Sequence, residues 1–434
     1  MSSTDTLNSQ KQIFGHPAGL YVLFFTEMWE RFSYYGMRAI LVLYLVAEST
    51  PDTINPGLNW ETGAALSLYG TYTMLVYVAS IPGGWIADNI LGQKKSVLYG
   101  GILLVLGHSI LAVEEMWAFY TGLGLIIAGV GMLKPNISSM VGGLYAQGDV
   151  RRDDGFIIFY IGINVGAFLS SLIVGYVGET YGWHYGFGAA GVGMLIGLGI
   201  YLAGQKYLPA EDFQPQHAAT AAATPKLQKS DWPALFALLL LIPVLALAIV
   251  PNNQIFNAYL VWGDSQFDLV WMGQKMPTTW LVTLDAIVSV SFLAIVALFY
   301  RWYGKRFREP DEVSKIIIGS AFSVLGMLCL VTAAATQGAG EKIGLFWPVA
   351  FHILNSIGFA HMLPVSLALF AKVAPKAVNA TVIGLYYLAF FSGNACLLQR
   401  LMHCRFNITL HGGGGGIRTH GDLRLTRFPS VPIR

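Results

Sequence analysis

Apolar segments long enough to cross a membrane recur along almost the whole chain, and short polar segments separate them. Six apolar segments precede residue 204 and five follow residue 231. About 20 apolar residues in an α-helix span the hydrocarbon core of a bilayer, so each segment predicts one membrane-spanning helix. The predicted helices lie at about residues 20–50, 62–87, 96–113, 117–145, 155–177, 184–203, 232–260, 280–303, 315–336, 343–371 and 378–399.

A polar stretch divides the predicted helices into two groups. Residues 205–231 combine an Ala/Thr-rich run with three prolines, a composition typical of a flexible linker. We therefore expect an all-α polytopic membrane protein with a six-helix amino half at residues 1–204 and a carboxyl half at residues 232–403. Residues 404–434 form a polar tail outside both halves.

The composition supports a membrane protein and gives no reason to expect nucleic acid as a partner. Of the 434 residues, 55% are hydrophobic and 12% are charged, against roughly 25% charged in a soluble domain. The net charge is only +2.

Loop charges alternate in sign along the chain. Because cytoplasmic loops carry an excess of Lys and Arg, we expect a cytoplasmic amino terminus and linker in a multi-pass protein of the cell (inner) membrane. The basic loops contain Lys94, Lys95, Arg151, Arg152, Lys206, Lys226, Lys229, Arg301, Lys305, Arg306, Arg308, Lys372 and Lys376.

Four charged side chains lie inside the first apolar stretch, from about Leu20 to Val46: Glu27, Glu30, Arg31 and Arg38. Each costs about 3 kcal/mol at the bilayer centre, so we expect them to face the protein interior or a water-filled cavity. Steps of three and four residues place three of these charges on one polar stripe with Tyr34. Glu27 stands four residues before Arg31, the favourable orientation for an ion pair. The alternative is a helix end whose charges snorkel into the lipid headgroups.

Residues 27–36 read Glu-x-x-Glu-Arg-Phe-x-Tyr-Tyr-Gly and resemble the signature of the proton-dependent oligopeptide transporters, a branch of the major facilitator superfamily. The resemblance implies a major facilitator fold of two six-helix halves with a cavity between them. It also implies symport of di- and tripeptides with protons by alternating access, without enzyme chemistry, metal or cofactor besides the coupling proton. We expect a monomer in a lipid bilayer, with a peptide as its substrate.

The same resemblance implies that Glu27, Glu30, Arg31 and Lys134 couple the proton to the peptide. Protonation of either glutamate would break its pairs with Arg31 and Lys134 and free these cations for the peptide carboxylate. Lys134 lies midway through a predicted helix, where a lysine needs an acidic partner or a water-filled cavity. The alternative is a lysine that snorkels at a helix break beside Pro135.

Peptide binding is expected at side chains from five predicted helices. Residues 156–166 resemble the family's second signature and contain Asn164, whose amide can both donate to and accept from a peptide. An asparagine here can instead bind a neighbouring helix. The resemblance also implies a binding role for Tyr72, which falls where the family places a binding-pocket tyrosine, before the loop aspartate Asp88. The alternative is a group of interfacial tyrosines that includes Tyr69 and Tyr77. The expected substrate-binding residues are Arg31, Tyr35, Arg38, Tyr72, Lys134, Asn164 and Asp285.

The carboxyl half departs from the family pattern. Its seventh and tenth helices usually each bring a glutamate into the cavity, but Phe359 stands at the tenth-helix position and, on a looser alignment, Asn253 at the seventh. Asp285 stands where the family has an asparagine, and we expect it to hold the peptide's amino terminus, to titrate, or to do both. The alternative is a carboxylate paired for structure alone with His352 or His361.

The loop after the second predicted helix resembles a loop common to major facilitators, with Gly84, Asp88 and Gly92 before a basic pair. Glycines permit close helix contacts, and Asp88 can accept hydrogen bonds from helix-end amides or bind a cation. We expect a conformational role, which gives no information about the substrate.

The carboxyl-terminal tail does not fit two six-helix halves. Five glycines at residues 412–416 precede an Arg-rich segment that eleven spans would place on the outer side of the membrane, against the charge rule. We expect that the twelfth span is missing and that residues 404–434 are a foreign, disordered tail; a natural exposed tail is the alternative. Two rival functions stay open: a carrier of another small organic solute, and an inactive truncated transporter.

Overall fold

The computed structural model describes residues 11–50, 55–146, 149, 151–208, 228–338, 340–374, 382 and 386. The predicted tail, most of the predicted linker and almost all of the predicted helix at residues 378–399 lie outside these residues. The expectations about the twelfth span, the tail and the domain boundaries therefore stay predictions.

The amino-terminal helices pack against one another around α2, which contacts α3, α6 and α8. Each of the six apolar segments of this half corresponds to a helix. A π-helical turn, η2 (Ser171–Gly175), joins α6 to α7, so these two helices form one span. The helices are α2 (Ala18–Val46), α3 (Thr62–Ile86), α4 (Gln93–Leu111), α5 (Met116–Gly143), α6 (Arg151–Ser170), α7 (Tyr176–Tyr181) and α8 (Trp183–Gly204).

The carboxyl-terminal helices form a second group, in which α13 contacts α9, α11 and α12. The segment at residues 232–260 was predicted as a single helix, and this is wrong. It is interrupted at residues 255–257, where Asn257 leaves the helical region with φ −133° and ψ −111°. The helices are α9 (Trp232–Gln254), α10 (Ala258–Gln266), α11 (Trp280–Tyr303), α12 (Glu312–Thr336) and α13 (Phe346–Val373).

The remaining elements are short and lie between or beside the helices. Two hairpins precede α2 and α11, and single helical turns follow α3 and flank the linker. They are β1 (Gln12–Ile13), β2 (His16–Pro17), β3 (Val270–Trp271), β4 (Gln274–Lys275), η1 (Ala87–Leu91), η3 (Gln205–Tyr207) and η5 (Lys229–Asp231).

The surface of the helices is suited to lipid. Among the described residues, eight helical segments are long and apolar enough to cross a membrane. Large apolar side chains are exposed on their outer faces, whereas a soluble protein avoids wide exposed apolar patches. Examples are Leu239, Leu240, Leu247, Ile295, Leu298, Val324 and Leu328.

Two glycines bring α3 and α5 into backbone contact. A Cβ atom on Gly83 would lie 2.0 Å from the carbonyl oxygen of Gly131, and one on Gly131 would lie 2.5 Å from that of Ala79. Gly84 has no atom within 4 Å of the corresponding position, so the close contact expected for this loop is made by Gly83. Gly92 has φ 79°, which lets the chain turn into α4.

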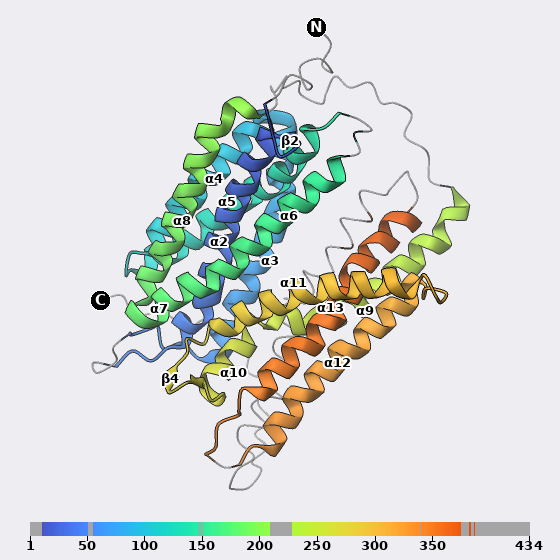
Figure 1. Cartoon of the computed structure of the whole chain (residues 1–434). Helices are drawn as coiled ribbons and strands as arrows, with labels where there is room; N and C mark the ends of the chain where they lie inside the picture. Colours follow the sequence, from blue (N-terminus) through green and yellow to red (C-terminus); the bar gives the residue numbers. More distant parts are fainter. Residues whose placement is uncertain are drawn as a thin grey trace.

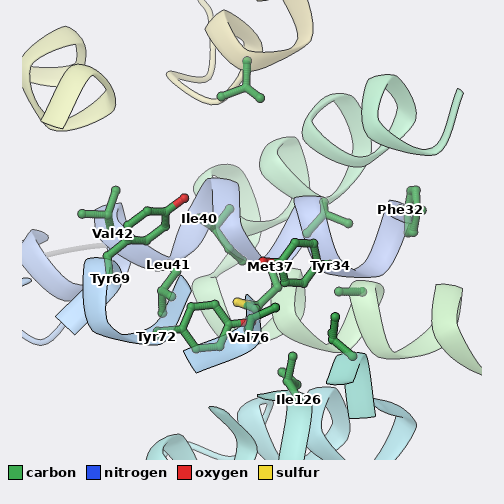
Figure 2. Packing of buried hydrophobic residues seen from close by; sticks show 14 of the residues in the cluster. Phe32, Tyr34, Met37, Ile40, Leu41, Val42, Tyr69, Tyr72, Val76 and Ile126 are labelled. Atoms are coloured by element: carbon green, nitrogen blue, oxygen red, sulfur yellow. The ribbon is translucent and has the colours of Figure 1, made fainter. Parts of the chain in front are cut away.

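The central part of α2 is buried in the amino-terminal core. Figure 2 shows Met37 and Leu41 of α2 beside Tyr72 and Val76 of α3, with Ile126 of α5 below them. All five side chains are at most 2% exposed. Because this packing fixes the helix along its length, the charged side chains of α2 are held in defined positions.

The two groups meet at one end of the molecule. There α10 contacts α2, and α11 contacts α6 and η2. Figure 1 shows the groups as two bundles, with α10 and the start of α11 lying near α7. The helix that carries the charged stripe, α2, is therefore also the helix of the amino half that contacts α10.

Candidate functional site

Two buried carboxylates of α2 share one guanidinium group. The Nε atom of Arg31 lies 2.7 Å from Oε1 of Glu27 and 2.8 Å from Oε2 of Glu30. The three side chains are at most 3% exposed, so they lie in the protein interior and do not snorkel to headgroups. The i, i+4 spacing predicted the pair between Glu27 and Arg31, and this prediction is confirmed.

The sharing leaves acceptor oxygens without partners. Among the described residues, Oε2 of Glu27 and both carboxylate oxygens of Glu30 accept no hydrogen bond, because Nε–H of Arg31 donates to Oε1 of Glu27 and Glu30 only forms an ion pair with it. When both glutamates are ionised they carry one more charge than Arg31 balances, which is costly unless it is compensated, and Lys134 is a further cation that acts on both electrostatically. A single proton on either glutamate would remove the excess charge and add a donor.

The close packing of α6 holds this network in place. A Cβ atom on Gly166 would lie 2.2 Å from the carbonyl oxygen of Met28, so only glycine lets α6 approach α2 so closely here. This glycine belongs to the second signature segment, residues 156–166. A larger side chain at Gly166 would push α6 away from the part of α2 that carries the charged residues.

Arg38 is a buried cation with a hydroxyl and aromatic rings as its neighbours. Its Nε and Nη2 atoms donate to the hydroxyl of Tyr69 at 2.9 and 2.5 Å. Its Cζ atom lies 4.7 Å from the ring centre of Phe256 and 5.3 Å from that of Tyr34. No acidic side chain of the described part of the chain pairs with it. An incoming anion could therefore bind Arg38 without displacing a carboxylate.

Phe256 comes from the interruption between α9 and α10, so the surroundings of Arg38 include both halves. The ring of Tyr35, a predicted substrate-binding residue, lies 5.8 Å from that of Phe256. Sequence reasoning missed Phe256. Pro251 and the two asparagines that follow it were the available signal for a helix break there.

Tyr72, a predicted substrate-binding residue, is buried in this structure. Its side chain is only 2% exposed, and its hydroxyl has no partner among the described residues. Figure 2 places its ring in the apolar core beside Val76. Tyr69, one helical turn earlier, binds Arg38, and the expected role of Tyr72 in substrate binding stays a prediction.

Lys134 does not pair with the glutamates of α2. No ion pair among the described residues joins it to Glu27 or Glu30. Its Nζ atom lies 4.8 Å from the ring centre of Tyr77, a distance typical of a cation–π contact. Lys134 nevertheless interacts electrostatically with Glu30 and Glu27, and its role in proton coupling stays a prediction.

Asn164 contributes its amide to its own helix. Its Nδ2 atom donates to the carbonyl oxygen of Tyr160 at 2.8 Å. The Nδ2 atom of Asn164 therefore does not form the hydrogen bond to a neighbouring helix that was the alternative role. Because Asn164 is half-buried, its role in peptide binding stays a prediction.

Asp285 lies in a hydrogen-bonded chain in the carboxyl half. Its Oδ1 atom lies 3.0 Å from Nδ1 of His352, and Nε2 of the same ring lies 2.9 Å from the hydroxyl of Tyr259. The alternative partner named from the sequence, His352, is therefore present. The other, His361, contacts the carbonyl oxygen of Ile357 instead. Tyr259 was not found from the sequence, because α10 was merged with α9.

A second acidic group joins the two halves at the end where they meet. Oε1 of Glu179 on α7 accepts from the amide and the hydroxyl of Thr279 at 2.8 and 2.6 Å. Its Oε2 atom accepts from the amide of Thr278 at 2.7 Å. These amides precede α11, and a carboxylate at a helix amino terminus is stabilised by the helix dipole. The contact was not predicted, since its partners lie about 100 residues apart.

The loop after α3 is exposed at Asp88. This residue lies in the π-helical turn η1, between the glycines at 84 and 92. Its predicted conformational role is not decided by this position.

Comparison with known proteins gives consistent matches. A family model described as the POT family matches residues 94–224. The uncharacterized transporter YclF of Bacillus subtilis (strain 168) is 36% identical, over 90% of this chain and 88% of that protein. A di-/tripeptide transporter of Lactococcus lactis subsp. cremoris is 32% identical over 90% of each chain. A crystal structure of a mutant peptide transporter POT in complex with alafosfalin superposes with a TM-score of 0.84 at 31% identity, covering 94% of this chain and 95% of that one.

Proposed function

The chain belongs to the POT family of transporters with the major facilitator fold, and from this premise we propose that it carries di- and tripeptides with protons by alternating access. The observation that carries the proposal is the buried network of Glu27, Glu30 and Arg31, which can take up a proton on the same helix as Arg38, a cation with no acidic partner in the described part of the chain. We further propose that it works as a monomer in the inner membrane with its amino terminus in the cytoplasm, and without a cofactor or covalent chemistry.

A peptide is a zwitterion, and the proposed site offers charges for both of its ends. Arg38 can bind the carboxylate, since its described neighbours are Tyr69 and aromatic rings. Arg31 becomes available when a proton neutralises one of the two glutamates that hold it. Asp285 is the acid proposed to balance the ammonium group, as the positions at 253 and 359 are not acidic.

Proton coupling then follows from charge balance alone. Before protonation, Arg31 is held by two carboxylates and has little affinity for a third. After protonation, one carboxylate remains, and the peptide carboxylate takes the place of the other. Charge-assisted hydrogen bonds contribute roughly 1.5–3 kcal/mol each, enough to make peptide binding depend on the proton.

Uptake into proteoliposomes tests the proposed function. An inward proton gradient should drive accumulation of a labelled dipeptide, and a protonophore should abolish it. Unlabelled di- and tripeptides should compete. If no dipeptide is taken up or competes at any pH, while the protein binds another small solute, the rival carrier function replaces this one. One observation favours that rival: Asp285, the acid proposed to bind the peptide ammonium group, is already paired with His352.

Asp285→Asn is expected to weaken binding of free dipeptides at least about tenfold, because an ammonium group left without its counter-charge in a buried site is strongly disfavoured. Dipeptides with an acetylated amino terminus should lose much less. Calorimetric titration of the purified protein measures both affinities.

Ser289→Ala is the matched control for this test, because Ser289 lies one turn further along α11 and bonds to Ser356 of α13 at 3.0 Å. It should change neither affinity appreciably. Equal losses for free and acetylated dipeptides in Asp285→Asn would show that Asp285 only supports the structure through His352.

A further inference from the structure

His352 is buried and bound at both ring nitrogens. It is 0% exposed, and its ring connects Asp285 of α11 with Tyr259 of α10. The ring is also packed against aromatic side chains, with centroids 5.1 Å from Phe351 and 5.3 Å from Tyr259. Both ring nitrogens of His352 therefore have hydrogen-bond partners, the carboxylate of Asp285 and the phenol of Tyr259, in addition to its apolar packing.

The hydrogen-bonded chain can hold one additional proton. In the neutral ring, Nδ1–H donates to the ionised Asp285, and Nε2 accepts from the hydroxyl of Tyr259. When a proton binds Nε2, the ring becomes a cation that donates to both neighbours. The net charge of the chain then changes from −1 to 0, which is favourable in a membrane interior.

Few other charges face this group. Among the described residues, the titratable side chains from packed elements that contact this group or act on it electrostatically are Asp285 from α11, Tyr259 from α10 and the thiol of Cys329 from α12. From α9 the nearest polar contact is an amide pair, in which Asn355 donates to Asn252 at 2.9 Å. Asp285 is therefore the acid with which a proton on His352 interacts directly.

We propose that His352 is a second proton-binding residue, separate from the glutamates of α2, and that its proton competes with the ammonium group of the peptide for Asp285. The proposal rests on the proposed peptide transport. Either cation neutralises the same carboxylate, and both together would leave a net positive charge. Acidification thus strengthens binding of the peptide carboxylate, by protonating a glutamate of α2. It weakens binding of the ammonium group, by protonating His352 of α13.

The test compares a dipeptide with the same dipeptide acetylated at its amino terminus. Binding to the purified full-length protein is measured by calorimetry at about pH 5.5 and 7.5, the range in which histidine titrates. The affinity for the free dipeptide divided by the affinity for the acetylated one isolates the contribution of the ammonium group, because effects at Glu30 act on both ligands alike. In the native protein this ratio should fall about tenfold on acidification, as expected for a competing proton.

His352→Gln should remove the pH dependence of this ratio, since an amide can bond to both neighbours but does not titrate. Ser356→Ala, one turn further along α13, is the matched control and should keep the native fall. A native ratio that is the same at both pH values, or a native fall retained in His352→Gln, overturns the proposal.

A second measurement needs no variant. In weakly buffered solution near neutral pH, binding of the free dipeptide to the native protein should release more protons than binding of the acetylated one, as a pH indicator reports. Equal release contradicts the competition. If the native protein binds neither dipeptide at either pH, the peptide-transport proposal fails instead, which is a distinct outcome.

Discussion

Glu30→Gln is expected to lower dipeptide uptake driven by a proton gradient by more than about a hundredfold, while exchange of peptide without net proton movement is largely retained. The carboxylate is 0% exposed, and its Oε2 atom lies 2.8 Å from Nε of Arg31. Glutamine resembles the protonated acid permanently, so Arg31 keeps only its pair with Glu27 at any pH and no proton is carried at this position. Changes at a buried ion pair amount to roughly 3–5 kcal/mol, which corresponds to a factor above about a hundred.

Proteoliposomes provide both measurements for this prediction. Uptake under an inward proton gradient reports coupling, and counterflow with peptide on both sides reports the carrier itself. Ser33→Ala is the control, because Ser33 is also buried on α2 and its hydroxyl has no partner among the described residues. Proton-driven uptake at the native rate in Glu30→Gln would remove this residue from the coupling mechanism. A loss of counterflow to the same extent would assign it to substrate binding or folding.

The sequence predicted those parts of the site that depend on local geometry. The pair between Glu27 and Arg31 follows from the helical repeat, and the burial of four charges follows from the length of the apolar segment around them. Partners on other helices did not follow in the same way. Lys134 was assigned to the glutamates by charge and by the family resemblance, but its Nζ atom lies over Tyr77, because the packing of α3 against α5 decides which side chains it contacts directly.

For a similar reason, the sequence did not show which tyrosine of α3 binds Arg38. Tyr69 and Tyr72 are one helical turn apart, and spacing from the following loop did not distinguish the side that faces Arg38 from the side that faces the core. Figure 2 shows that both rings lie beside α2. Only the rotation of α3, set by contacts such as Gly83 against Gly131, separates the two positions.

Helix positions were predictable from hydropathy, whereas the interruption between α9 and α10 was not. Asn252, Asn253, Gln254 and Asn257 interrupt the apolar character near residues 255–257, but the apolar residues on both sides led to the prediction of one helix at 232–260. This error hid two features, since Phe256 reaches Arg38 and Tyr259 reaches His352. Interrupted helices are typical of transporter binding sites, and hydropathy alone does not reveal them.

The contact of Glu179 with the start of α11 is expected to stabilise the closed arrangement of this end of the molecule. It accepts three hydrogen bonds from Thr278 and Thr279. Gly175 permits the approach, because a Cβ atom there would lie 2.1 Å from Oγ1 of Thr279. When the halves separate at this end, the carboxylate loses all three donors at once. The contact can therefore bias which side of the membrane the site faces.

Glu179→Gln should accordingly raise the population open at this end by about tenfold to a hundredfold relative to the closed one. A glutamine presents its own N–H group to at least one of the amides and lacks the charge, so roughly 1.5–3 kcal/mol is lost. Spin labels at the exposed positions Thr180 and Lys275 report the separation by electron–electron resonance. Glu114→Gln makes the same charge change at an exposed residue of another acidic loop and should leave the distances unchanged. Identical distance distributions for the native protein and Glu179→Gln would show that the halves are held together at this end by apolar packing, and that the three hydrogen bonds only accompany it.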